Sequence, residues 1–261
     1  FDSHDWGLII YDEVHLLPAP IFRFTADIQS RRRLGLTATL VREDGMEGEV
    51  FSLIGPKRFD VPWKEIEAQG YIAPADCVEV RVTLTDHERL TYATAEQEDK
   101  YRSCSTTETK KKIVLALAKK HAEDQTLIIG QYINQIDELA ADLGVPIIKG
   151  ETPVKEREAL FAKFRTGELK CLVVSKVANF SIDLPEASVA IQVSGTFGSR
   201  QEEAQRLGRI LRPKADGRTA RFYSVVARDT IDQDFAQNRQ RFLAEQGYSY
   251  RIIDADEVLR S

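Results

Sequence analysis

Short apolar runs alternate along this chain with longer stretches in which apolar residues recur every three or four positions. Residues 7–12 are almost continuously apolar up to a final aspartate, which is typical of a strand buried on both faces. Residues 33–37 predict a second short strand, and residues 63–69 predict a short helix that ends at Gly70. Residues 77–84 alternate between apolar and polar side chains, and therefore predict a strand with one polar face.

The pattern becomes regular after residue 86. Residues 86–103 are polar and helical in pattern, and residues 109–122 place Ile113, Leu117 and His121 on one face of a helix. Strands are then predicted at 126–129, 146–148, 171–175, 189–193 and 221–226, and helices at 134–143, 153–165, 199–211 and 231–245. Strands that alternate with helices predict a parallel sheet covered by helices on both faces.

The elements are distributed unevenly between two domains. Residues 1–62 supply only two clear strands, too few to enclose a core, whereas the elements after about residue 71 suffice for a complete α/β domain. The chain of 261 residues begins at Phe1, and its only methionine is Met46. We therefore expect a piece of a longer protein, with one whole domain preceded by the tail of another.

Composition narrows the class of protein. The chain has no run approaching the roughly 18 apolar residues of a membrane span, and its first residues do not resemble a secretory signal. Its three cysteines are widely spaced, which argues against a disulfide framework and indicates a reducing compartment. The net charge is −5, so a nucleic-acid partner would require a local basic surface. The clusters Arg31–Arg33 and Lys110–Lys112 are either phosphate contacts or, more commonly, solvated faces.

Two groups of polar residues follow the first two predicted strands. Asp12 and Glu13 place adjacent carboxylates at the strand end where open α/β sheets bind ligands. One carboxylate could hold Mg²⁺ and the other could activate a water that attacks a γ-phosphate, although two solvated acids at a strand end fit the pattern equally well. Thr37 and Thr39 follow the second strand, and on their own they are more typical of a turn or a cap.

A third group lies on the helix predicted near residue 205. Gln205, Arg209 and Arg212 fall at positions i, i+4 and i+7, so they share one helical face opposite Leu207 and Leu211. Guanidinium groups are always charged and suit the phosphate oxygens of a transition state. A solvated basic face is the alternative interpretation.

These three motifs, in this order and at this spacing, resemble motifs II, III and VI of the superfamily 2 helicases and translocases. Motif III runs directly into Arg42-Glu43-Asp44, a tripeptide typical of the XPB-type DNA repair helicases. Residues 174–185 resemble motif V of that family, and residues 195–204 lead into motif VI as in its bacterial members. The resemblance covers nearly the whole chain and implies the C-terminal half of such a helicase.

The resemblance implies a fold and its boundaries. It implies an α/β architecture, with a RecA-like parallel sheet that has helices on both faces. Residues 63–261 would form this second helicase domain, with a short thumb-like insertion at about 86–107. Residues 1–62 would be the C-terminal end of a first RecA-like domain.

The resemblance also implies roles for individual residues. Asp12 would bind Mg²⁺, Glu13 would activate water, and Arg209 and Arg212 would act as arginine fingers. The residues implied to contact ATP or couple its hydrolysis to DNA are His15, Thr37, Thr39, Asp183 and Gln205. The residues implied to contact DNA are Arg42, Glu43, Asp44, Gly150, Thr152, Ser175 and Lys176. Thr152, followed by a proline, is the expected N-cap of a helix whose N-terminus would face a DNA phosphate.

The implied function is ATP-dependent opening of DNA during repair. It would use ATP and Mg²⁺ in a monomer of the bacterial cytoplasm, at the nucleoid and away from membranes. DNA would be the main partner, with a repair nuclease or other repair proteins as further partners. The chain has no Gly-x-x-x-x-Gly-Lys followed by Ser or Thr, so we expect it to be inactive by itself. The alternative is a non-enzymatic RecA-like module that binds nucleic acid or a partner protein. An unrelated hydrolase or metalloenzyme is disfavoured, because the sequence contains neither HExxH nor GxSxG.

Overall fold

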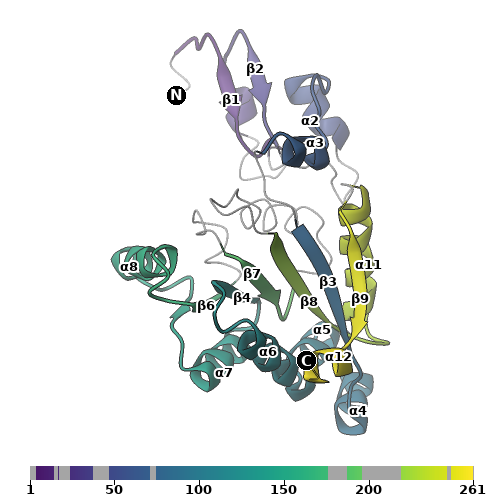
Figure 1. Cartoon of the computed structure of the whole chain (residues 1–261). Helices are drawn as coiled ribbons and strands as arrows, with labels where there is room; N and C mark the ends of the chain where they lie inside the picture. The colour runs from purple at the N-terminus through teal and green to yellow at the C-terminus, as the bar shows by residue number, and fades with distance from the viewer. Residues whose placement is uncertain are drawn as a thin grey trace. The chain divides into compact units, whose positions relative to one another are not determined.

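A computed structural model of the chain describes residues 4–14, 17, 24–37, 47–70, 75–175, 187–195, 219–245 and 248–260 (Figure 1). The chain divides into two compact units, one within residues 1–61 and the other beginning at Pro62. The helix predicted at 199–211 lies outside the described residues.

The first unit is built on two short parallel strands. β1 (Ile9–Tyr11) pairs with β2 (Arg33–Gly35), so both strands predicted in this part of the chain are present. The 3-10 helix η2 (Phe24–Asp27) precedes β2. The helix α2 (Glu47–Ile54), which the sequence pattern did not predict, supplies Val50 to a small core. The opposite face of the strands exposes four aliphatic side chains, those of Leu8, Ile10, Leu34 and Leu36.

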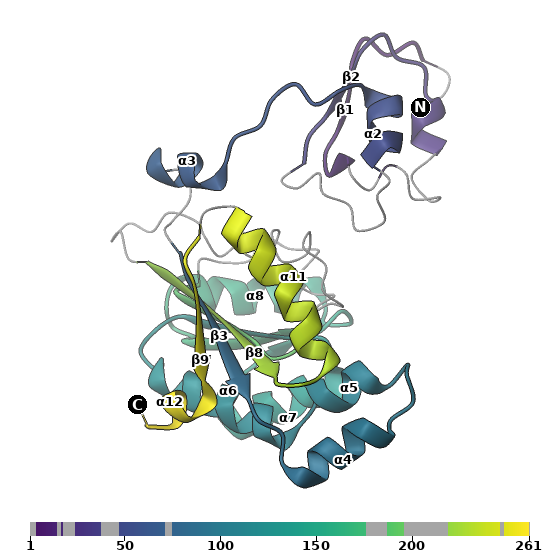
Figure 2. The same ribbon diagram turned by 90° about the vertical axis from the view of Figure 1, so that its right-hand side faces the viewer.

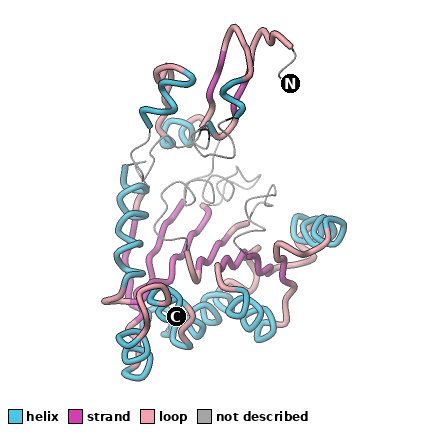
Figure 3. Tube along the Cα trace, turned by 180° about the vertical axis from the view of Figure 1, so that it is seen from behind, coloured by secondary structure: helices cyan, strands magenta, loops and turns pink. Residues whose placement is uncertain are grey.

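The second unit contains one seven-stranded sheet. Its strands are β3 (Ala75–Val82), β4 (Thr126–Gly130), β5 (Ile147–Ile148), β6 (Cys171–Ser175), β7 (Val189–Gln192), β8 (Ala220–Ala227) and β9 (Tyr250–Asp254). The strands lie side by side in one sheet (Figure 3). Their order is β5-β6-β4-β7-β8-β3-β9, and every pair is parallel. The predicted α/β class with a parallel sheet is confirmed.

Helices cover both faces of this sheet. They are α3 (Trp63–Ala68), α4 (Asp86–Thr94), α5 (Lys100–Ser105), α6 (Glu108–Lys120), α7 (Ile133–Leu143), α8 (Val154–Arg165), α11 (Ile231–Glu245) and α12 (Ala255–Arg260). The sheet separates α6, α7 and α12 from α8 and α11 (Figures 1 and 2). The predicted face of α6 is confirmed, because Ile113, Leu117 and His121 are all buried.

The helices before α6 form part of this unit. α4 has no buried residue, whereas α5 buries Tyr101 and Cys104 in the same core as α6 and α7. The region predicted as a thumb-like insertion, 86–107, is therefore a surface helix followed by a helix that packs into the domain. The short α3 ends as predicted, since Gly70 has the left-handed φ of +79° that favours glycine.

The strand predicted at 77–84 is present as β3, and its polar residues Glu79 and Arg81 share one face as predicted. Glu79 is nevertheless only 1% exposed. Its carboxylate accepts hydrogen bonds from Arg81 Nε at 2.8 Å and from the Tyr250 hydroxyl at 2.5 Å. Tyr250 belongs to β9, which was not predicted, so an element that the sequence pattern missed supplies a side chain that covers Glu79. The helix α12, also not predicted, packs Ala255 and Val258 on the opposite, apolar face of the sheet.

Candidate functional site

The pairing of β1 with β2 brings the first two motifs to one edge of the small sheet. Asp12 and Glu13 directly follow Tyr11, and Thr37 lies two residues beyond Gly35. Tyr11 and Gly35 are register partners in parallel strands. The acidic pair and Thr37 therefore both lie beyond the C-terminal strand ends, where α/β sheets commonly bind ligands.

The chain makes a defined turn at the acidic pair. The Leu36 amide donates to the Tyr11 carbonyl at 2.8 Å, and the Val14 amide donates to the Leu36 carbonyl at 2.9 Å. Between these contacts, Glu13 has a left-handed φ of +51°, and its amide donates to Asp12 Oδ1 at 2.9 Å. A non-glycine residue in this conformation is strained, and such strain is concentrated at functional sites.

The turn is held against the second strand by close packing. Val14 is 4% exposed and belongs to the small core with Leu17 and Val50. A Cβ added at Gly35 would lie 2.8 Å from Val14 Cγ2, which is closer than carbon atoms can approach. Glycine at this position therefore allows Val14 to pack into the small core, and this packing fixes the turn that carries the two acids.

The acidic pair suits a hard cation. The side chain of Asp12 is exposed and that of Glu13 is partly buried, so the turn offers carboxylate oxygens to an approaching ligand. The described residues contain no group of three or more His, Cys, Asp or Glu side chains that could enclose a metal ion. Mg²⁺ fits such a site, because it usually keeps several waters and takes one or two carboxylates together with substrate phosphates.

The second unit has its own candidate surface at the C-terminal ends of β5 and β6. Gly150 and Thr152 lie in the turn after β5, and Gly150 is exposed. The Lys149 amide donates to Thr152 Oγ1 at 2.9 Å, and the Thr152 amide donates to the Lys149 carbonyl at 3.1 Å. Ser175, at the end of β6, is only 1% exposed.

The predicted N-cap at Thr152 is wrong. α8 begins at Val154 with Pro153 at the cap position, and no side chain caps it. The Thr152 hydroxyl is already bonded to the Lys149 amide within the preceding turn. A residue before proline is also held in an extended conformation, which keeps Thr152 outside the helix.

Two cationic side chains join this turn to the neighbouring helices, Lys149 from within the turn and Arg157 from α8. Arg157 Nη2 of α8 donates to the carbonyls of Gly150 at 3.2 Å and Thr152 at 3.0 Å. Lys149 Nζ lies 2.9 Å from Asp137 Oδ1 of α7. The hydrogen bonds of Asp137 raise the pKa of Lys149, so its ammonium stays charged beside the turn.

The cluster Lys110–Lys112 does not form one continuous surface, because Lys112 is exposed whereas Lys110 is buried. Lys110 is 0% exposed, and its ammonium lies 2.6 Å from Asp232 Oδ2. Lys111 bridges Glu138 at 3.2 Å and Asp142 at 3.1 Å, and these two carboxylates raise its pKa to about 12. The interpretation of Lys110 as a solvated or phosphate-binding residue is therefore wrong, because an acid 122 residues away in the sequence pairs with it inside the core.

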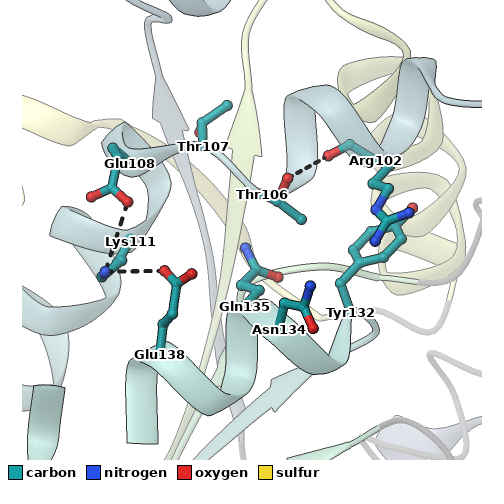
Figure 4. Close-up of a pocket in the computed structure, with 9 residues that line it drawn as sticks. All are labelled: Arg102, Thr106, Thr107, Glu108, Lys111, Tyr132, Asn134, Gln135 and Glu138. Carbon is teal, nitrogen blue, oxygen red and sulfur yellow. Dashed lines mark hydrogen bonds and ion pairs between the residues drawn. The ribbon is translucent and has the colours of Figure 1, made fainter. Parts of the chain in front are cut away.

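A hollow of about 170 Å³ opens beside this cluster (Figure 4). Arg102 lies over the ring of Tyr132, with its guanidinium carbon 5.7 Å from the ring centroid. At the other end of the hollow, Lys111 lies between Glu108 and Glu138. The cationic groups of the hollow are thus engaged with side chains of the protein itself.

The other predicted site residues lie outside the described residues. They are His15, Thr39, Arg42, Glu43, Asp44, Lys176, Asp183, Gln205, Arg209 and Arg212. Their roles stay predictions from the resemblance.

Comparison with known proteins identifies the family. The model of the ERCC3/RAD25/XPB C-terminal helicase family matches residues 66–261. The chain belongs to the XPB helicase family. It is 74% identical over 258 residues to the DNA 3'-5' helicase XPB of Kineococcus radiotolerans, covering 99% of this chain and 46% of that protein. It is 73% identical to the same helicase of Mycobacterium tuberculosis, covering 99% of this chain and 47% of that protein.

More distant members extend the family to eukaryotes. The Saccharomyces cerevisiae general transcription and DNA repair factor IIH helicase/translocase subunit is 39% identical, covering 96% of this chain and 31% of that protein. The chain therefore spans less than half the length of these relatives, and it matches the C-terminal part of the bacterial ones. The predicted resemblance to the C-terminal half of an XPB-type helicase is confirmed.

Solved structures confirm the RecA-like helicase fold. Saccharomyces cerevisiae Dbp5 bound to RNA and ADP BeF3 has a TM-score of 0.65 at 15% identity, covering 98% of this chain and 62% of that one. The Pyrococcus furiosus Hef helicase domain has a TM-score of 0.55 at 13% identity, covering 92% of this chain and 74% of that one. In the part of the chain that the structure describes, no helix is long and apolar enough to span a membrane.

Proposed function

We propose that this chain is the C-terminal half of an ATP-dependent DNA helicase or translocase that acts in DNA repair. The observation that carries the proposal is the strained turn at Asp12 and Glu13, beside Thr37 at the same strand edge. The bacterial relatives are named as DNA 3'-5' helicases, which supports ATP as the energy source and DNA as the substrate.

The two acids would divide the chemistry between them. Asp12, exposed at the strand end, would help to hold Mg²⁺, which when bound neutralises phosphate charge. Glu13 would orient a water molecule toward the γ-phosphate and accept its proton, and partial burial keeps competing water away from that carboxylate. His15, Thr37, Thr39, Asp183 and Gln205 would contact the nucleotide or couple its hydrolysis to DNA.

Two arginines of the motif VI sequence would act as arginine fingers in this reaction. Arg209 and Arg212 would meet negative charge that develops on the transferred phosphoryl group, where a fixed guanidinium is most effective. The chain would need the phosphate-binding loop of the preceding half to hydrolyse ATP, because its own sequence contains none.

DNA would be bound at the turn after β5. The carbonyls of Gly150 and Thr152 are engaged by Arg157, so the turn has less negative potential to repel a phosphate. Gly150 has no side chain and is exposed, which allows a DNA backbone to approach closely. Lys176 and the tripeptide at 42–44 would add further contacts to DNA, whereas Ser175 is too deeply buried to contact it directly.

The cellular setting follows from the same proposal. The protein would act as a monomer at the bacterial nucleoid, with a repair nuclease or other repair proteins as partners. Without its preceding half, the chain would behave as a nucleic-acid-binding module, since the loop that holds the phosphates is absent from its sequence.

Replacement of Glu13 by Gln in the full-length protein tests the proposal. The amide keeps the shape of the side chain but cannot accept the proton, so kcat for DNA-stimulated ATP hydrolysis should fall by roughly 10²- to 10⁴-fold. ATP binding should be retained, because the rest of the turn is unchanged. Steady-state ATPase kinetics and nucleotide titration measure the two effects.

The matched control is Asp27→Asn, which removes an exposed charge from the same unit away from the turn. It should keep wild-type kcat. Wild-type turnover in Glu13→Gln would contradict the proposed catalytic role.

A further inference from the structure

The residue Gly195, three positions after β7, is held by a buried hydroxyl. The Tyr101 hydroxyl of α5 donates to the Gly195 carbonyl at 2.8 Å and accepts from the Gly195 amide at 2.9 Å. Tyr101 is 2% exposed, and burial raises its pKa, so the hydroxyl stays protonated and can do both. One side chain thus binds both backbone polar groups of a residue 94 positions away in the sequence, and these groups belong to the two successive peptide units on either side of Gly195 Cα.

The residue Val193 is held by a buried ion pair. Lys110 Nζ of α6 donates to the Val193 carbonyl at 2.9 Å and lies 2.6 Å from Asp232 Oδ2 of α11. Asp232, 1% exposed, also accepts from the Ala227 amide at 2.9 Å. A buried ion pair seldom stabilises a fold more than apolar residues would, so its benefit here is the fixed position of the groups that it binds.

Ser194, between these two residues, is held by α7. Its hydroxyl accepts from the Gln131 amide at 2.7 Å and donates to Gln135 Oε1 at 3.0 Å. The side-chain Nε2 of Gln135 donates to the carbonyl of Ser105, the last residue of α5, at a distance of 2.6 Å. Each of the helices α5, α6 and α7 therefore contributes one polar side chain that binds one of the three consecutive residues 193–195.

We propose that Tyr101, Lys110 and Gln135 are positioning residues for the reaction, and we refer to them as the β7 anchor. They hold Val193–Gly195, from which the chain continues directly into residues 196–212, the segment whose sequence carries Arg209 and Arg212. The inference rests on the proposed function, because it requires those arginines to act in catalysis. None of the three residues is proposed to touch the nucleotide.

The geometry at Gly195 leaves little tolerance. A Cβ added there would lie 2.5 Å from Gln192 Nε2 and 3.2 Å from Arg239 Nη1, so the residue is enclosed by side chains of β7 and α11. A catalytic group displaced by about 1 Å can lose on the order of 100-fold in rate. A network that fixes the start of the arginine segment is therefore expected to affect kcat.

Tyr101→Phe in the full-length protein is the primary test. The phenyl ring keeps the contacts with Phe235, at 5.1 Å between centroids, and with Tyr132, at 6.3 Å, so only the hydroxyl is lost. We expect kcat for DNA-stimulated ATP hydrolysis to fall at least about tenfold, with KM for ATP changed less than about twofold. A purely structural role would lower the melting temperature and leave kcat unchanged, which would overturn the inference.

Tyr250→Phe is the matched control. It removes a hydroxyl of β9 that is bonded to the buried Glu79 of β3, and two strands, β8 and β3, lie between β9 and β7 in the sheet. The melting temperature should fall, whereas kcat should stay within about twofold of wild type. An equal loss of kcat in both variants would show a general effect of destabilisation and would contradict the inference.

A second variant, Ser194→Ala, provides a test that does not depend on the folding of Tyr101→Phe. It removes a hydroxyl that bonds Gln131 and Gln135 but leaves the buried ring and the ion pair in place. The inference expects the same pattern, a several-fold lower kcat at unchanged KM. Wild-type kcat in Ser194→Ala and in Tyr101→Phe would reject the β7 anchor.

Arg209→Ala separates the inference from the proposed function. Wild-type kcat in Arg209→Ala would contradict the proposed role of that arginine. A large loss in Arg209→Ala together with wild-type kcat in Tyr101→Phe would contradict the β7 anchor alone. If Tyr101 acts through Arg209, the double variant should be no slower than Arg209→Ala, whereas independent, multiplicative losses would overturn that coupling.

Discussion

At the scale of single residues, the turn after β1 depends on the absence of a side chain at Gly35. The Val14 side chain occupies the space where a Cβ would lie, with 2.8 Å between the two carbon positions. Val14 directly follows Glu13 in the chain, so a shift of Val14 would also move the turn at Asp12 and Glu13. The proposed site is therefore coupled to packing on the opposite strand.

Gly35→Ala should destabilise the first unit. The added methyl must push Val14 out of its core, which costs about 1–3 kcal/mol for an overpacked site. In the full-length protein we also expect lower kcat, because the turn at Glu13 shifts. Urea denaturation and ATPase kinetics measure the two effects.

Gly48→Ala is the control for that substitution. A Cβ at Gly48 meets nothing within 4 Å, and alanine favours a helix more than glycine does. It should leave stability unchanged or raise it by up to about 1 kcal/mol. Equal destabilisation by the two substitutions would contradict the packing argument.

At the scale of secondary-structure elements, one carboxylate joins two helices. Glu88 of α4 accepts from the Thr85 amide at 2.9 Å within a capping box, and from the Thr109 amide of α6 at 3.0 Å. Burial by itself raises the pKa of Glu88, but the hydrogen bonds from Thr109 and Thr85 outweigh it and leave that pKa below its usual value. The ionised carboxylate is therefore the form that ties α4 to the domain.

Glu88→Ala should lower the free energy of unfolding at pH 7 by about 1–2 kcal/mol. A larger loss is not expected, because solvent screens the charge at this partly exposed site. A depressed folded-state pKa contributes stability above the unfolded pKa of about 4.3, and that contribution is lost as pH falls through the folded value. The difference between wild type and variant should therefore shrink below about pH 4. Denaturation at several pH values measures it.

Glu98→Ala, at an exposed position in the turn after α4, is the matched control. It should change stability by less than about 0.5 kcal/mol at every pH. A Glu88 effect that does not change with pH would show that packing, and not the charge, is responsible.

At the scale of the whole molecule, net charge limits how DNA can be held. The chain carries 36 basic and 41 acidic residues, so its overall field repels phosphate. Several cations of the described residues are also paired internally, as Lys110 is with Asp232. Binding must come from a local surface, for which the turn at 149–152 is the proposed position.

DNA affinity of the chain should be weak and should fall steeply with salt, because each neutralised phosphate releases bound counterions. Lys176→Gln, directly after β6 in the chain, should reduce the slope of log Kd against log salt by about one phosphate contact. Lys119→Gln, on an exposed position near the end of α6, is the control and should leave the slope unchanged. Fluorescence anisotropy between about 50 and 200 mM salt measures it, and constant affinity over that range would count against DNA binding.

The amino-acid sequence by itself determined the class of fold and most of its elements. β6 and α11 have the predicted bounds, because continuous apolar runs and helical periodicity are local properties of the chain. The sequence also placed Asp12 and Glu13 at a strand end and identified the family, since motif order and spacing can be read without coordinates. Those predictions needed no information about distant contacts.

Only the tertiary structure decided which polar residues are buried and what holds them. Glu79 lost its expected solvent exposure because Tyr250 of β9, 171 residues later, covers it. Lys110 looked like part of a basic surface, but α11 brings Asp232 to it inside the core. Tyr101 carried no sequence signal, although its hydroxyl binds both polar groups of Gly195. Burial and pairing across such separations depend on the order in which strands and helices pack, and local sequence patterns do not encode that order.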